Sequence, residues 1–120
     1  MSNNKVSNEE NLGKAKSYLQ RFSENITGHF INGQFEVPTN AETFENFTPV
    51  DNTTLGKVVS GSNQDIDRAC DAAKAAFADW RDMSGAGRKK LLNHFADKIA
   101  ARAEEIALIE SMDCGQPIRF

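Results

Sequence analysis

The feature that most constrains this sequence is a change in hydrophobic periodicity at Ser62. After Ser62, apolar residues recur at steps of three and four, which is the spacing of an amphipathic α-helix. Before it, the apolar runs are short and are separated by turn-forming pairs such as Asn32-Gly33, which is typical of β-hairpins. The sequence therefore predicts an α/β fold in which amino-terminal hairpins are accompanied by a layer of antiparallel helices.

Two hairpins are predicted before Ser62. Residues 29–31 and 34–37 flank Asn32-Gly33, a dipeptide that accepts positive φ at both central positions of a type I′ turn. Residues 43–47 and 54–60 form the second pair, with turn chemistry supplied by the proline, aspartate and asparagine between them. Two small hairpins cannot form a core alone, so they need a helical layer or another sheet to cover them.

Three helical segments are predicted after them. The first begins at a cap on Ser62 or Asn63 and carries one continuous apolar face. That face consists of Ile66, Ala69, Cys70, Ala73, Ala76, Phe77 and Trp80. The second begins at a cap on Ser84 and is expected to bury a stripe of its own. That stripe consists of Leu91, Leu92, Phe95, Ala96, Ile99 and Ala100. The third runs from about residue 102 to 112, and Gly115 is placed to end it in the left-handed conformation.

We divide the chain into residues 1–27, a polar and partly disordered segment, and residues 28–120, which form the folded part. Disorder or fraying is expected up to about residue 13, with one short helix over residues 13–22. The large apolar side chains exceed what two hairpins and a helical pair can cover, so the isolated chain is expected to be marginally stable and prone to associate. These side chains are Phe44, Phe47, Ile66, Phe77, Trp80, Phe95 and Ile99.

The composition excludes several classes of partner. The formal net charge is −3 and the pI is about 5.4, so neither a nucleic acid nor an anionic membrane is expected to bind. No apolar run approaches the roughly 18 residues of a membrane span. The first residues have no apolar core, which argues against a secretory signal, and two cysteines are too few for a disulfide scaffold. We therefore expect a cytoplasmic protein with reduced thiols.

Individual residues that suggest chemistry have simpler interpretations. Cys114 falls at the carboxyl end of a predicted helix, where the dipole disfavours a thiolate, so it is not expected to be a nucleophile. Cys70 lies on an apolar helix face and is expected to be a small core residue. His29 and His94 lack ligand spacing with any cysteine, so no zinc site is expected. Residues 85–90, Gly-Ala-Gly-Arg-Lys-Lys, match no phosphate-binding loop and follow no strand, so they are interpreted as the first turn of a helix.

The order of the remaining motifs resembles the amino-terminal part of the aldehyde dehydrogenase superfamily over residues 30–118. The similarity lies in six segments that follow one another in the family's order. The first two are Phe30-Ile31-Asn32-Gly33 and Thr48-Pro49-Val50-Asp51, and the next two are the helix from Asp67 to Trp80 and the helix that carries Arg88, Leu91, Leu92, Ala96 and Ile99. The last two are Glu104-Glu105-Ile106-Ala107 with Glu110, and Asp113-Cys114-Gly115-Gln116-Pro117. The chain also departs from the family. Thr48 stands where the family usually has Asn, and Gln116 stands where Lys is common. Gly85 and Gly87 stand where Pro and Glu are common. The segment 115–119, Gly-Gln-Pro-Ile-Arg, resembles members that act on semialdehydes from aromatic-compound breakdown.

The resemblance implies that this chain is an incomplete piece of the nucleotide-binding domain of a longer protein, called here the parent protein. It implies that the parent protein oxidises an aldehyde to a carboxylic acid with NAD or NADP, through a cysteine thiolate and a thioester that a glutamate-activated water releases. The parent is expected to be a homo-oligomer. Because the family's catalytic and cofactor-binding residues follow the matched region, none is assigned to this chain, which is expected to be inactive alone.

One site is implied within the chain itself. Some family members hold a monovalent cation between two backbone carbonyls and an aspartate. Asn46, Phe47 and Asp113 stand at those positions in this sequence. The alternative is that Asp113 only caps its helix or pairs locally. Two other functions remain open for the whole chain. One is a stand-alone, non-catalytic interaction module derived from the same fold, and the other is an unrelated enzyme that uses Cys114.

Overall fold

The computed structural model describes residues 7–118 of the chain. In chain order its elements are α1 (Asn8–Glu24), β1 (His29–Ile31), β2 (Gln34–Glu36), β3 (Thr43–Phe47), β4 (Thr54–Val59), α2 (Asn63–Asp82), α3 (Gly85–Ala100) and α4 (Ala103–Cys114). The strands form two separate antiparallel hairpins, β1–β2 and β3–β4. The predicted fold class, hairpins followed by helices, is confirmed.

The hairpin turn and the helix ends follow the local sequence. Asn32 and Gly33 have φ values of 51° and 76°, as a type I′ turn requires. The Ser62 hydroxyl accepts from the backbone N–H of Asp65, whose side chain accepts from the backbone N–H of Ser62, so a capping box starts α2. Gly115 is left-handed, with φ of 74°, and ends α4.

The amino-terminal helix is longer than expected. It begins at Asn8, capped by the Ser7 hydroxyl, and continues to Glu24. The expected fraying of residues 8–13 is therefore wrong, because the cap and the two glutamates of the first turn stabilise a helix start there. Residues 1–6, for which disorder was also expected, lie outside the described part of the chain.

The core lies where α1, α4 and β4 meet. Its buried apolar side chains are Ala15 of α1, Leu55 and Val59 of β4, and Leu108 of α4. A segment before β1 also joins β4, since the N–H of Thr27 donates to the carbonyl of Lys57 at 2.8 Å. The first helix, which was expected to be minor, therefore covers the second hairpin and contributes to the only core that the described residues form.

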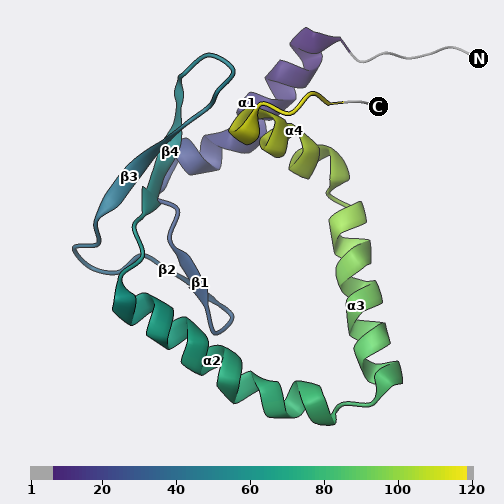
Figure 1. The fold of residues 1–120 in the computed structure, drawn as a ribbon. Helices are drawn as coiled ribbons and strands as arrows, with labels where there is room; N and C mark the ends of the chain where they lie inside the picture. The colour runs from purple at the N-terminus through teal and green to yellow at the C-terminus, as the bar shows by residue number, and fades with distance from the viewer. Residues whose placement is uncertain (1–6, 119–120) are drawn as a thin grey trace, which may run out of the picture.

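Helices α2 and α3 lead away from this core. Figure 1 shows them as two arms that extend from the hairpins and return the chain to α4, which lies beside α1. The radius of gyration is 18.3 Å, whereas a compact domain of this length has one of about 14 Å. None of the helices in the described residues is long and apolar enough to cross a bilayer.

The predicted burial of the α2 and α3 faces is wrong for this chain. Neither helix has a buried residue, and Cys70, expected in the core, is exposed. The physical reason is that no element of the described chain packs along these faces. All seven side chains expected to exceed the available cover, from Phe44 to Ile99, are indeed exposed.

Candidate functional site

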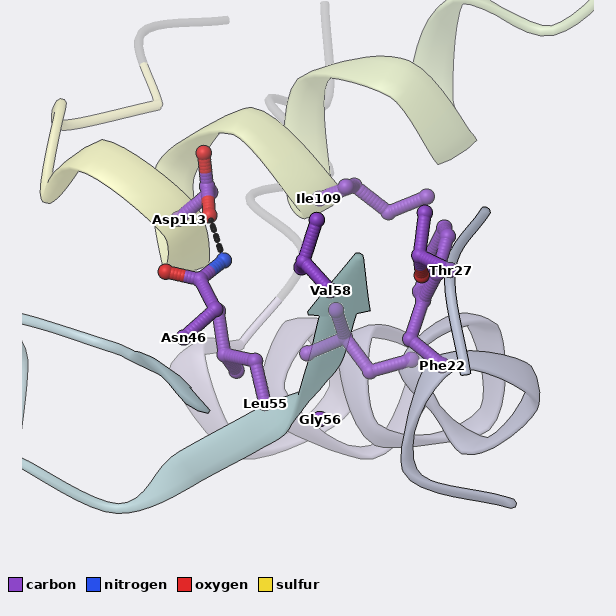
Figure 2. A pocket seen from close by; sticks show the side chains of 9 residues that line it. Phe22, Thr27, Asn46, Leu55, Gly56, Val58, Ile109 and Asp113 are labelled. Carbon is purple, nitrogen blue, oxygen red and sulfur yellow. Dashed lines mark hydrogen bonds between the residues drawn. The ribbon is translucent and has the colours of Figure 1, made fainter. Parts of the chain in front are cut away.

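The residues predicted to share a cation site come together although they are far apart in sequence. Asn46 is near the end of β3, and Asp113 is in the last turn of α4. The Asn46 side-chain amide donates to Oδ1 of Asp113 at 2.6 Å. Figure 2 shows this bond, with the second carboxylate oxygen of Asp113 pointing away from Asn46. The two residues are 67 positions apart, so this bond is a tertiary contact between β3 and α4 and not a local cap of the helix.

The strand is irregular at this point. The register of β3 and β4 shifts between Asn46 and Phe47, which pair with Gly56 and Thr54. A bulge of this kind redirects the backbone and leaves ladder groups unpaired. The Thr54 hydroxyl donates to the Asn46 carbonyl at 3.4 Å. The side chain of Phe47 is exposed. Backbone carbonyls at a bulge beside a carboxylate are oxygen donors of the type that hard cations prefer.

Gly56 makes the bulge possible. Its φ is 144°, which only glycine adopts readily, and an added Cβ would lie 2.1 Å from the carbonyl oxygen of Phe22 in α1. The glycine therefore allows the end of α1 to approach β4. The sequence carried this signal, a glycine inside a predicted strand, but the prediction did not use it.

Thr48 is the site residue that the sequence interpretation missed. Its side chain is completely buried and its hydroxyl donates to the backbone carbonyl of Met112. That carbonyl belongs to the last turn of α4, where helical carbonyls have no partner within the helix. The backbone carbonyl of Thr48 also accepts from the backbone N–H of Asn52 at 2.9 Å, so one residue joins the β3–β4 turn to the end of α4. The sequence interpretation used Thr48 only as part of a motif that resembles the family, in which it replaces the usual Asn.

A cavity of about 210 Å³ opens beside the Asn46–Asp113 pair. Its walls come from α1, from Thr27, from the second hairpin and from α4 (Figure 2). They are formed by Leu19, Phe22, Thr27, Asn46, Leu55, Gly56, Val58, Ile109 and Asp113. The cavity is mostly apolar; its polar side chains are those of Asn46 and Asp113, which are hydrogen-bonded to each other, and that of Thr27 on the opposite side (Figure 2). This arrangement can hold a cation or a polar backbone segment at that pair, and it presents no nucleophile.

Ion pairs attach α1 to α4 close to this cavity. Lys14 contacts Glu104 at 2.7 Å, and Arg21 contacts Glu105 at 2.9 Å. The hydrogen bond from Lys14 is the main reason that the pKa of Glu104 lies below its ordinary value. These carboxylates therefore stabilise the helix pair in their ionised form.

Cys114 has structural surroundings. Its thiol donates to the backbone carbonyl of Glu110 at 3.1 Å, one turn earlier in α4. Gly115 follows it in the left-handed conformation. In the described residues no group of three or more histidine, cysteine or carboxylate side chains could hold a metal ion.

The glycine-rich turn before α3 does not fit a dinucleotide. It follows α2, whereas dinucleotide phosphates are bound where a strand leads into a helix. The Ser84 hydroxyl already accepts from the N–H of Gly87, and the Arg88 guanidinium donates to the carbonyls of Arg81 and Met83 at the end of α2. We assign no cofactor contact to this turn.

Comparison with known proteins places this chain in a family of enzymes. A sequence model described as the aldehyde dehydrogenase family matches residues 36–120. The Escherichia coli protein named NADP/NAD-dependent aldehyde dehydrogenase PuuC is 47% identical over 92 residues, which are 75% of this chain and 19% of that protein. Aldehyde dehydrogenase 1 of Tanacetum cinerariifolium is 38% identical over 110 residues, 90% of this chain and 22% of that protein.

Solved structures of two other proteins have the same fold over this region. The crystal structure of HpcC from Thermus thermophilus superimposes with a TM-score of 0.82 at 33% identity, over 88% of this chain and 20% of that one. The Delta-pyrroline-5-carboxylate dehydrogenase of Mycobacterium tuberculosis superimposes with a TM-score of 0.71 at 21% identity, over 93% of this chain and 21% of that one, which supports the fold alone. The chain spans about a fifth of the length of the curated relatives that it matches.

Proposed function

The chain belongs to the aldehyde dehydrogenase family, and from this premise we propose that it is the amino-terminal portion of an enzyme that oxidises an aldehyde to a carboxylic acid with NAD or NADP. The observation that carries the proposal is the family match over residues 36–120. It is supported by the E. coli relative, whose name gives both cofactors. The fold alone would not be enough, because one fold can host many reactions.

Within that enzyme this chain supplies architecture. Residues 28–120 form part of the nucleotide-binding domain, and residues 1–27 precede it and contribute α1. The catalytic residues and the cofactor contacts belong to the remainder of the parent protein. This division is supported by the surroundings of Thr48, Cys114 and Arg88, which all make structural hydrogen bonds.

The reaction is tested with the complete reading frame that contains this chain. The purified protein is mixed with NAD or NADP and with aliphatic, aromatic and carboxylated aldehydes, and cofactor reduction is followed by absorbance. Reduction with at least one aldehyde is expected. A folded protein that reduces neither cofactor with any of them would overturn the assignment.

For the substrate we propose a semialdehyde that carries a second acidic group. The support is the sequence Gln116-Pro117-Ile118-Arg119. The last of these residues lies outside the described part of the chain. Activity on the simple aldehydes alone would remove this substrate and leave the reaction class. We also propose a homo-oligomeric parent, which light scattering on the same protein tests.

We propose further that Asn46, Phe47 and Asp113 hold a monovalent cation in the parent protein. The backbone carbonyls at the bulge and the second Asp113 oxygen would be the ligands, and the Asn46 amide orients the carboxylate through its 2.6 Å bond. Such an ion would fix the end of α4 against β3 and would take no part in the reaction.

Thermal unfolding of the full reading frame in sodium and in potassium chloride, at equal ionic strength, tests the cation. The parent protein should melt at different temperatures in the two salts, and Asp113→Ala should abolish that difference. Asp71→Ala, which removes an exposed carboxylate from α2, is the matched control and should keep it. A difference that persists in Asp113→Ala, or that is missing in the parent protein, would contradict the cation role.

A further inference from the structure

The imidazole of His29, in β1, is packed against the start of α2. Its side chain exposes 19% of its surface, and its Nε2 atom is buried without a hydrogen-bond partner among the described residues. Oδ2 of Asp65 lies 3.5 Å from that nitrogen, which is within the range of an ion pair. Buried polar atoms nearly always have a hydrogen-bond partner, so this ring nitrogen requires a physical explanation.

Asp65 is the residue through which α2 both begins and meets the first hairpin. Its carboxylate accepts from the backbone N–H and the hydroxyl of Ser62, at 2.9 and 2.6 Å, and so caps the helix. The pKa of Asp65 lies below its ordinary value, mainly because the Ser62 hydroxyl donates to it. Asp65 therefore faces His29 as a carboxylate throughout the pH range in which histidines change charge.

Two more charged groups complete this cluster. Glu36 of β2 stands opposite His29 in the hairpin ladder. The guanidinium of Arg68, in α2, donates to Glu36 and lies 3.5 Å from the Asp65 carboxylate. Two carboxylates and one guanidinium leave one negative charge in excess while His29 is neutral, and a proton on His29 cancels that charge. The positive end of the α2 dipole opposes the proton, but it amounts to only about half an elementary charge, and Asp65 sits directly on it.

We propose that His29 and Asp65 form a pH-dependent ion pair that ties the first hairpin to the start of α2. A histidine takes up its proton from solvent between about pH 5 and 8, where aspartate, glutamate and arginine keep their charges. The imidazolium carries an N–H on each ring nitrogen, so Nε2 then donates a charge-assisted hydrogen bond to the carboxylate. Figure 1 shows the β1–β2 hairpin beside α2, so this pair fixes the direction in which α2 leaves the hairpin. Mild acid tightens the joint and a higher pH loosens it.

Hydrogen–deuterium exchange of the full reading frame at about pH 5.5 and about pH 8, corrected for the intrinsic pH dependence of exchange, tests the ion pair. Peptides over residues 29–36 and 62–69 report on the joint, and a peptide over residues 103–114, in α4, reports any general change in stability. The joint should exchange roughly fivefold more slowly at the lower pH, as one ion pair allows, and the α4 peptide should not.

Two variants remove the titrating group in opposite ways. His29→Gln is neutral and should exchange rapidly at both pH values, whereas His29→Lys is permanently charged and should exchange slowly at both. The matched control is His94→Gln, which removes the exposed histidine of α3 and should keep the pH difference. A joint with no pH difference in the unsubstituted protein would overturn the proposal, and so would a difference that persists in either His29 variant. Because exchange does not depend on activity, the result is independent of the aldehyde assay.

Discussion

Replacing Thr48 by valine should loosen the connection between the second hairpin and the end of α4. The substitution keeps the shape of the side chain but removes the hydroxyl that donates to the Met112 carbonyl and accepts from the N–H of Val50. Because the side chain is completely buried, water cannot replace these bonds without a rearrangement. Leaving the part-buried Met112 carbonyl without this donor costs about 1–3 kcal/mol.

This cost can be read locally by hydrogen–deuterium exchange of the 120-residue chain, with mass spectrometry of peptides from residues 43–59 and 103–114. A loss of about 1–3 kcal/mol corresponds to roughly 5- to 150-fold faster exchange in both peptides. The control is Thr43→Val, the same substitution at an exposed position of β3, and it should change stability by less than about 0.5 kcal/mol. Equal exchange in Thr48→Val and the unsubstituted chain would refute the role given to the hydroxyl.

Three further outcomes are expected from the 120-residue chain. Gly56→Ala should destabilise the chain, because the new Cβ would lie 2.1 Å from the Phe22 carbonyl oxygen. Gly13→Ala in α1 should stabilise it by up to about 1 kcal/mol, because nothing lies within 4 Å of the new Cβ. Urea unfolding of both variants measures whether the free energy of unfolding falls in the first and rises in the second. The lowered pKa of Glu104 predicts stability that is present above the ordinary glutamate pKa and is lost as the pH falls through the lowered value. The loss of stability with falling pH should be smaller in Glu104→Gln, which keeps the shape of the side chain but not the charge that pairs with Lys14. Acid unfolding curves of the two proteins that fall with the same slope would disprove this. The chain should also self-associate with rising concentration, and analytical ultracentrifugation that finds only monomer would show that the exposed faces of α2 and α3 need no cover.

The sequence was sufficient for local structure. Both hairpins and the three later helices appear within one or two residues of their predicted bounds, because turn dipeptides, caps and periodicity act over a few residues. Helix α1 was underestimated because its cap at Ser7 and its glutamates lie in a stretch whose polar composition indicated disorder.

Burial could not be predicted in the same way. Periodicity shows that the α2 and α3 faces are apolar, but whether they are buried depends on elements that these residues do not contain. Cys70 was therefore placed in a core that the described chain does not form. The meeting of Asn46 with Asp113 was expected only from family resemblance, and the Thr48 hydrogen bond was not expected at all. Both depend on tertiary contacts between residues more than 60 positions apart.

We propose that this chain contributes part of the fold of an aldehyde dehydrogenase but none of its cofactor contacts. Calorimetric titration with NAD and with NADP, carried out on the 120-residue chain and on the full reading frame under the same conditions, tests it most directly. We expect saturable binding of at least one cofactor by the full protein and no binding by the chain alone. Saturable micromolar binding by the purified chain would contradict it.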